Sequence, residues 1–360
     1  MAPPPKLPPE PRGAISRIHP YEWEPPSASI ARRAGVPEDQ VVRFDTNTFP
    51  WPGARLDALT SQALNEYPDT SYAALTEAIA QYADVPTDRI TVGAGADEIL
   101  DLIAKAYIDA ASRVLLSHPT YPMFRILTEM AGGSTDEVRA IDLHLDRRAF
   151  LERARDARLT WLCNPNNPTG ELLPLDFIEE VAVATDGALV VDEAYFETSG
   201  VTALPLIDRV PNAVVVRTLS KAFGLAGVRV GYALAGPAIS HALRKVRPPG
   251  SISVVSAALG IQALTDVDGM RRRVRQVKDE RARLRRDLQA LSFEVRDSAA
   301  NFVLVQTGRA VAPALLKKGL VVRTFPATSL LAEYIRVTVR RPEENERLVA
   351  ALRAVRRDVA

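Results

Sequence analysis

Short apolar runs that alternate with helix-like stretches restrict most strongly how this 360-residue chain can fold. The stretches between these runs carry apolar residues at helical spacing. Continuous runs rich in β-branched residues, separated by helices, are typical of a mainly parallel sheet that helices cover on both faces. We therefore predict an α/β fold with a large sheet domain. The predicted strands are 90–92, 114–116, 159–163, 189–191, 213–216 and 230–233.

The pattern changes after Pro248-Pro249-Gly250, where longer helical stretches begin. The arginine-rich run 270–286 also carries acidic residues, which indicates a solvated helix face rather than a nucleic-acid site. Further strand-like and helix-like runs alternate beyond it, so we predict a smaller α+β domain at the C-terminus. The expected strands are 302–305, 321–325 and 335–339, and the expected helices are 311–318 and 343–355.

The N-terminal 26 residues are too rich in proline to form a helix or a central strand. We expect this segment to be extended, as the start of a proline-rich arm over 1–44 whose tip is disordered or which embraces a partner subunit from Ile18 onward. A helix is expected near 56–64. The predicted division of the chain is then an arm over 1–44, a large domain over 45–240 and a small domain over 241–360.

Composition excludes several classes of function. A net charge of +1 gives no general attraction to nucleic acid or membrane, and no apolar run is long enough to span a bilayer. The chain has one cysteine, Cys163, and four scattered histidines, so we expect neither a disulfide framework nor a metal centre. A reducing cytoplasm is the compartment that we expect.

Chemically different polar side chains follow the predicted strands. In sheets of this kind, ligands bind beyond the carboxyl ends of the strands, so we expect these side chains to surround one site. The residues are Asp97, Tyr121, Asn167, Asp192 and Lys221.

Lys221 needs a lowered pKa before it can act as a nucleophile, and desolvation or a neighbouring cation such as Arg229 can supply it. A lysine that forms an imine, together with a carboxylate that keeps a pyridine nitrogen protonated, is what pyridoxal 5'-phosphate requires. Asp192 is the candidate carboxylate, Tyr195 and Asn167 can donate to the phenolic oxygen, and Tyr121 can stack on the ring. The candidate phosphate ligands at a helix start and a nearby turn are Ala96, Asp97, Thr218, Ser220 and Arg229.

Each of these residues also has a purely structural interpretation. Gly93-Ala94-Gly95 resembles the start of a dinucleotide fingerprint, but Glu98 stands where the third glycine belongs. Asn166-Asn167-Pro168 is an ordinary turn composition, and Asp192 can serve simply as a helix cap. The ordered combination of residues is more specific than any one of them.

Three segments carry a resemblance to a known family. The segments 164–170, 191–195 and 218–229 resemble motifs of the fold-type I pyridoxal-phosphate aminotransferases, and most of all those of the histidinol-phosphate aminotransferases. The resemblance implies a pyridoxal 5'-phosphate enzyme in which Lys221, Asp192 and Tyr195 are catalytic. It further implies transamination, with histidinol phosphate as amino donor and 2-oxoglutarate as acceptor.

The same resemblance assigns residues to partners and substrate. Tyr67, in Tyr67-Pro68-Asp69, matches a tyrosine that reaches the cofactor phosphate of the neighbouring subunit, which implies a homodimer with shared sites. Arg336 matches an arginine that binds the substrate carboxylate, and Arg323 matches one near the distal phosphate of the substrate. Asn47 falls in a segment that contributes to substrate binding.

Two segments depart from the family pattern. An Asn-Glu-Asn-Pro segment is replaced by Asn47-Thr48-Phe49-Pro50, and a Val-Gly-Thr segment is replaced by Val339-Arg340-Arg341. The second departure resembles threonine-phosphate decarboxylases. Alternatives are therefore an aromatic or other amino-acid aminotransferase and a threonine-phosphate-type decarboxylase. A regulator with an aminotransferase-like domain and a nicotinamide oxidoreductase are poorer fits, since the first 44 residues lack a helix-turn-helix pattern and the glycine fingerprint is incomplete.

Overall fold

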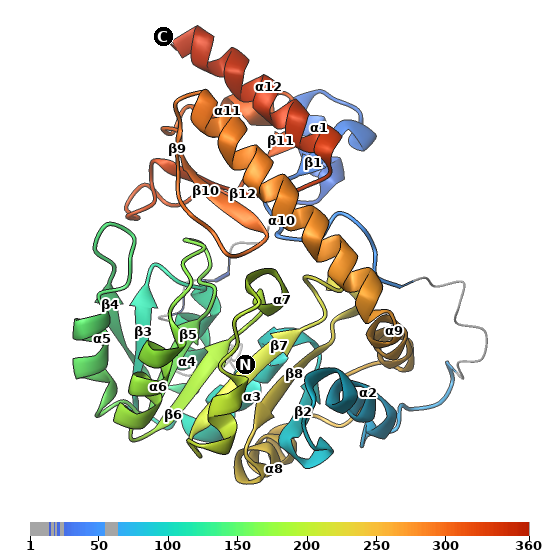
Figure 1. Cartoon of the computed structure of the whole chain (residues 1–360), viewed down its shortest axis with the longest axis vertical. Helices are drawn as coiled ribbons and strands as arrows, with labels where there is room; N and C mark the ends of the chain where they lie inside the picture. Colours follow the sequence, from blue (N-terminus) through green and yellow to red (C-terminus); the bar gives the residue numbers. More distant parts are fainter. Residues whose placement is uncertain (1–13, 16–17, 19, 22–24, 55–63, 360) are drawn as a thin grey trace, which may run out of the picture.

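The computed structural model describes residues 14–15, 18, 20–21, 25–54 and 64–359. They form two units that lie one above the other in Figure 1, with the long helix α10 (Val267–Ala290) running from one to the other. The expected helix near 56–64 and most of the proline-rich segment fall outside the described residues.

A seven-stranded sheet organises the larger unit, in the order β2-β8-β7-β6-β5-β3-β4. All neighbouring pairs are parallel except those that involve β8, which is antiparallel to both β2 and β7. The α/β fold class is confirmed. The strands are β2 (Ile90–Gly93), β3 (Arg113–His118), β4 (Ser134–Arg139), β5 (Leu159–Cys163), β6 (Ala188–Asp192), β7 (Ala213–Thr218) and β8 (Gly231–Ala235).

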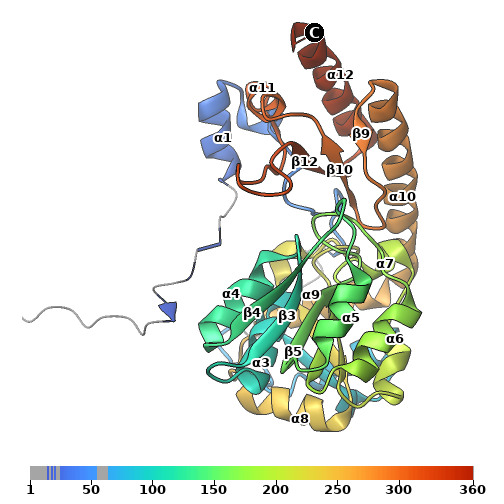
Figure 2. The ribbon, with the colours of Figure 1, turned by 90° about the vertical axis from the view of Figure 1, so that its left-hand side faces the viewer.

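The central strands are buried on both faces, which explains their continuous apolar composition. On β7, Val214 and Val216 belong to one apolar cluster and Ala213 and Val215 to the other. Helices cover each face in Figures 1 and 2. The cluster of Val214 includes residues of α3 (Gly95–Tyr107), α4 (Pro122–Ala131) and α8 (Pro237–Val246); that of Val215 includes residues of α2 (Ala73–Ala83), α6 (Leu175–Ala184) and α9 (Val254–Thr265).

Two strand predictions need correction. We missed β4, because its sequence Ser-Thr-Asp-Glu-Val-Arg is polar and it lies at the edge of the sheet, where one neighbour is enough. The run 321–325 was predicted as one strand, but β11 covers only Leu320–Val321. Beyond it, Arg323 forms an isolated antiparallel bridge with Arg336.

The smaller unit contains an antiparallel sheet in the order β12-β10-β9. Its strands are β9 (Glu294–Val295), β10 (Phe302–Gln306) and β12 (Tyr334–Thr338). Buried residues of α10, α11 (Val311–Leu316) and α12 (Pro342–Val359) pack with this sheet in a separate apolar cluster. The arginine-rich run lies on α10, whose buried residues include Met270, Val274 and Val277. Part of the run is exposed, as predicted for a solvated helix face, namely Arg271, Arg272, Arg275 and Arg286. Other arginines of the run are half-buried, namely Arg273, Arg281, Arg283 and Arg285.

The segment before residue 45 contacts the C-terminal unit. It contains α1 (Ser27–Ala34) and β1 (Val42–Arg43), and β1 pairs in parallel with β11. Figure 2 shows α1 beside the C-terminal elements. The division of the chain at residues 44 and 240 stays a prediction. No helix among the described residues is long and apolar enough to cross a membrane.

A close backbone contact joins β8 to the start of α3. A Cβ atom on Gly231 would lie 2.4 Å from the backbone nitrogen of Ala96. We expect Gly231→Ala to shift α3 and to destabilise the protein by about 1–3 kcal/mol, the usual cost of overpacking. Urea unfolding measures this change. Gly236→Ala is the matched control, because a Cβ there meets nothing within 4 Å. Equal stability of the two variants would contradict the prediction.

Candidate active site

The carboxyl ends of β5, β6 and β7 meet at one level of the sheet. Cys163 is paired in register with Asp192, and Asp192 with Val216. Asp192 is the last residue of β6, and Lys221 follows the end of β7 by three residues. The parallel register therefore brings the predicted carboxylate and the predicted lysine to the same edge.

Lys221 has the electrostatic environment of a reactive amine. Burial, followed by the positive charge of Arg336, lowers its pKa to about 8, although Asp97 and Asp192 oppose the shift. Its Nζ lies 5.5 Å from the centroid of the Tyr195 ring. Near neutral pH the neutral amine is thus far more populated than it would be for an exposed lysine.

Asp192 is a carboxylate removed from water. Its residue is 3% exposed, and burial raises its pKa to about 7. Among the described residues, its side chain accepts one hydrogen bond, 3.0 Å long, from the backbone N–H of Ala194. A buried carboxylate with so few donors is suited to a cationic N–H group of a ligand.

Hydroxyl groups and a cation lie near the start of α3. The Oγ atoms of Thr218 and Ser220 are 2.8 Å apart, and Arg229 donates to Ser220 at 3.5 Å. Gly95 opens α3 with φ of 85°, and a Cβ on it would lie 2.4 Å from Nη2 of Arg229. The positive φ of this residue favours glycine, and the guanidinium of Arg229 crosses the helix start beside it. The arrangement suits an anion, because a helix N-terminus presents free N–H groups and positive potential.

Asp97 links two of the predicted residues. It accepts a hydrogen bond of 2.7 Å from the hydroxyl of Tyr121 and one of 3.1 Å from Arg229. Burial, and then the charge of Asp97, raises the pKa of Tyr121 well above its ordinary value, so the phenol keeps its proton. Asp97 thus holds both the aromatic ring and the cation in place.

A second group of predicted residues joins the two units of the fold. Arg336, on β12, donates to Oδ1 of Asn167 at 2.7 Å and to the carbonyl oxygen of Asp45 at 2.6 Å. Asn47 donates to the hydroxyl oxygen of Tyr195 at 3.1 Å. Burial raises the pKa of Tyr195, so its hydroxyl retains a proton that it can donate.

The structure does not bring every predicted residue together. Tyr67 is 94% exposed in the single chain. Arg323 is half-buried, and its backbone exchanges hydrogen bonds with that of Arg336 at 2.9 and 3.1 Å. The roles assigned to these and to the other site residues stay predictions.

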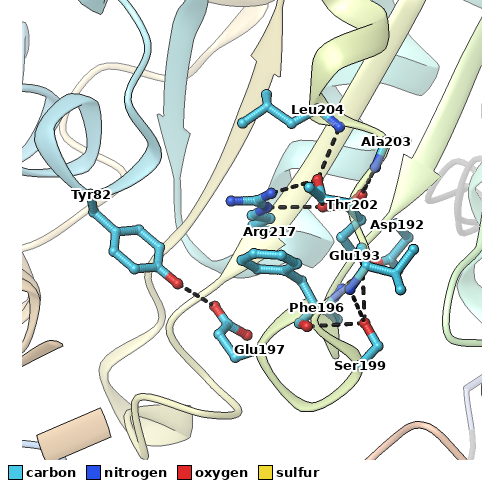
Figure 3. A network of polar contacts seen from close by, with 12 residues as sticks. Tyr82, Asp192, Glu193, Phe196, Glu197, Ser199, Thr202, Ala203, Leu204 and Arg217 are labelled. Carbon is cyan, nitrogen blue, oxygen red and sulfur yellow. Dashed lines mark hydrogen bonds and ion pairs between the residues drawn. The ribbon is translucent and has the colours of Figure 1, made fainter. Parts of the chain in front are cut away.

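Sequence reasoning missed a buried ion pair behind the site. Arg217 donates to Glu193 at 3.0 Å, with side chains that are 3% and 0% exposed. Figure 3 shows Arg217 beside the ring of Phe196, and its guanidinium carbon lies 3.8 Å from that ring's centroid. Glu197, whose pKa burial raises to about 7, accepts a hydrogen bond from Tyr82. Arg217 directly follows the apolar run 213–216, and this charged residue was the sequence feature from which a buried ion pair could have been predicted.

This pair fixes the segment that carries the predicted catalytic residues. Glu193 directly follows Asp192, and Tyr195 lies two positions further along the chain. Thr202 receives a hydrogen bond of 2.7 Å from Arg217. Val191 and Val215 belong to the apolar cluster on one face of the sheet, and Val190 and Val216 belong to the apolar cluster on the opposite face. Side chains alternate along a strand, so Glu193 and Arg217 meet on the face opposite to Asp192 and Thr218.

Fold and site together define an α/β protein in which a lysine whose pKa is lowered by burial and a buried carboxylate lie at the same edge of the sheet. A family model described as aminotransferase class I and II matches residues 41–352. The chain therefore belongs to the class I and II aminotransferases.

Relatives and solved structures agree with this assignment. The histidinol-phosphate aminotransferase of Caldanaerobacter subterraneus is 37% identical over 308 residues, which cover 83% of this chain and 87% of the relative. Histidinol-phosphate aminotransferase 1 of Archaeoglobus fulgidus is 38% identical, with coverages of 88% and 99%. The crystal structure of histidinol-phosphate aminotransferase from Sinorhizobium meliloti in complex with pyridoxal-5'-phosphate superposes with a TM-score of 0.87. It shares 27% identity over 97% of this chain and 98% of that one.

The environment of Lys221 predicts how its reactivity depends on pH. We expect the rate at which this lysine in the cofactor-free protein reacts with an amine-modifying reagent to be half-maximal near pH 8. Mass spectrometry of the modified peptide measures this rate. Lys221→Arg should remove the modification from that peptide. A midpoint near the ordinary lysine pKa of about 10.4 would contradict the burial that the structure shows.

The ion pair between Arg217 and Glu193 predicts a stability effect. Arg217→Met leaves a buried carboxylate without its cation, so we expect the free energy of unfolding to fall by about 3–5 kcal/mol. Urea unfolding of the cofactor-free protein measures it. Adding Glu193→Gln to this variant should restore part of the loss, because the uncompensated charge is then removed. A double variant no more stable than Arg217→Met would contradict this explanation.

Proposed function

We propose that this pyridoxal 5'-phosphate-dependent aminotransferase transfers the amino group of histidinol phosphate to 2-oxoglutarate, as a step of histidine biosynthesis. The observation that supports this cofactor is the lysine whose pKa is lowered by burial, Lys221, at the same edge of the sheet as the buried carboxylate of Asp192. The relatives named histidinol-phosphate aminotransferase, which are 37% and 38% identical over most of the chain, support the donor.

The residues present fit the cofactor. The buried carboxylate of Asp192 accepts only one hydrogen bond within the described chain and suits the protonated ring nitrogen. The start of α3 at Ala96, with the hydroxyls of Thr218 and Ser220 and the guanidinium of Arg229, suits the phosphate. Tyr121, whose hydroxyl donates to Asp97, is the candidate to stack on the ring, and Asn167 and Tyr195 are the candidates to donate to the phenolic oxygen.

When bound, pyridoxal 5'-phosphate supplies an aldehyde for linkage to an amine and a ring that accepts electrons. The protein controls protons and orientation. The Nζ of Lys221, with its pKa of about 8, would accept the proton from the α-carbon of the donor as a general base, and in its protonated form it would act as a general acid. Arg336, whose planar guanidinium is already held by Asn167, binds the α-carboxylate of the donor. The carboxylate of Asp192 keeps the ring nitrogen protonated.

We also propose a homodimer with shared active sites. The exposed side chain of Tyr67 is available to reach the cofactor phosphate in a second copy of the chain. Arg323, whose backbone pairs with that of Arg336, is the candidate for the distal phosphate of the donor. A chain with one cysteine, Cys163, which is buried, is suited to the reducing cytoplasm that we propose as its compartment.

One observation favours a second reaction. Val339-Arg340-Arg341 resembles threonine-phosphate decarboxylases, which use the same cofactor contacts but release carbon dioxide. The aromatic residues Phe49 and Trp51 similarly favour an aromatic amino donor as an alternative substrate.

The donor is tested by single-turnover spectroscopy of the purified holoenzyme. With histidinol phosphate, we expect the absorbance near 420 nm that is typical of such enzymes to be lost in one rapid phase, and 2-oxoglutarate to restore it. Phenylalanine and threonine phosphate are the comparison substrates, and Lys221→Ala is the inactive control. Rapid conversion by phenylalanine alone would reject histidinol phosphate as donor. Release of carbon dioxide from threonine phosphate would establish the decarboxylase instead.

A further inference from the structure

The two segments that depart from the family pattern contact each other. Arg340 donates to the hydroxyl of Thr48 at 3.5 Å, and Arg341 donates to the carbonyl oxygen of Pro50 at 3.3 Å. Phe49 and Val339 belong to the same apolar cluster. Although almost 300 residues separate them in the sequence, the two departures therefore form one structural unit.

Alternate residues from β12 onward hold the loop 45–53. Arg336 donates to the carbonyl oxygen of Asp45 at 2.6 Å. The hydroxyl of Thr338 donates to Oδ1 of Asn47 at 3.0 Å and accepts from the backbone N–H of the same residue at 2.9 Å. Side chains at positions 336, 338 and 340 of an extended chain share one face, so Arg340 continues this series of contacts.

Arg340 is itself fixed on the side away from the loop. Its guanidinium pairs with Glu344 at 3.2 Å, and its backbone N–H and carbonyl group both hydrogen-bond the side chain of Asn345, at 3.0 and 2.9 Å. The Arg340 side chain is 17% exposed. It therefore forms a polar link between the first turn of α12 and the loop 45–53, a link that a glycine at this position lacks.

The other side of this loop faces the predicted catalytic residues. Asn47 donates to the hydroxyl of Tyr195 at 3.1 Å. A Cβ on Gly224 would lie 2.3 Å from the carbonyl oxygen of Trp51, and one on Gly53 would lie 1.7 Å from that of Phe223. The loop thus packs without space for a side chain against the turn that follows Lys221. A shift of the loop must move both Asn47 and this turn.

We propose that Arg340 is a positioning residue: it fixes the loop 45–53 on the C-terminal unit and thereby holds Asn47 against the hydroxyl of Tyr195. Asn47 leaves the hydroxyl proton of Tyr195 free for donation, since it acts as the hydrogen-bond donor in their contact. This inference rests on the proposed function for the placement of Tyr195 at the cofactor. The anchoring of the loop does not depend on any ligand.

Hydrogen exchange of the cofactor-free protein tests the anchoring. In Arg340→Gly and in Arg340→Gln, we expect peptides within 45–53 to exchange faster than in the unchanged protein, whereas β3 exchanges at the same rate. Arg340→Lys should restore part of the protection, because it keeps one charged donor. Arg286→Gln, on the exposed part of α10, is the control. If the peptides within 45–53 exchange at the same rate in Arg340→Gly and Arg340→Gln as in the unchanged protein, the proposal is overturned.

A double-mutant cycle on the holoenzyme tests whether Arg340 acts through Asn47. Arg340→Gly should lower kcat/KM about fivefold, the size of one lost hydrogen bond, and should shift the pH midpoint of the cofactor absorbance. In the Asn47→Ala background the same substitution should have little further effect. Effects that multiply would show that the two residues act independently and would reject the inference.

The two proposals fail in different ways. If the unchanged protein transaminates none of the donors tested, the proposed function fails whatever the exchange rates show. If it is active and Arg340→Gly leaves both the exchange of the loop and the cofactor spectrum unchanged, only the role of Arg340 fails. Should Arg340→Gly not fold, Arg340→Gln and Arg340→Lys provide the same comparison with a smaller change in backbone freedom.

Discussion

Burial of Asp192 next to Lys221 is the constraint on which the rest of the site depends. Removing these groups from water disfavours the charged form of each, which raises the pKa of the acid to about 7 and lowers that of the lysine to about 8. In the chain without a ligand, both groups therefore titrate near neutral pH. The parallel register of β5, β6 and β7 places them at one edge without a dedicated loop for either.

The opposite face of the same strands makes this placement rigid. Glu193 follows Asp192 by one position, and Arg217 precedes Thr218 by one position. Glu193 and Arg217 form a buried ion pair on the far side of the sheet. Such a pair contributes little net stability compared with apolar residues, but loss of one partner is costly. We infer that this pair restricts the conformation of the chain around Asp192 and Thr218. Catalytic geometry depends on this restriction because misplacement of a reacting group by about 1 Å slows a reaction severely.

The sequence was sufficient to predict those structural features that depend on a local pattern of residues. Strand β5 was predicted with the bounds that the structure shows, and the start of α3 at Gly95 follows from its small residues. The edge strand β4 could not be found, because edge position lets polar residues form a strand. The sequence also could not show that β8 is antiparallel to its neighbours, since the composition of an apolar run is the same for parallel and antiparallel strands. The contact between Asn47 and Tyr195 joins residues 148 positions apart, and no local pattern indicates it.

The departures from the family pattern show why a substitution must be interpreted with its contacts. In the sequence alone, Val339-Arg340-Arg341 suggests a change of reaction. In the structure, Arg340 and Arg341 contact the other altered segment, at Thr48 and Pro50. The proposed loop anchoring would account for these arginines without a change of reaction. The motif therefore carries less information about the reaction than its resemblance indicates. In the proposed function, Arg336 would orient the substrate beside Lys221, and this orientation would decide between the two reactions.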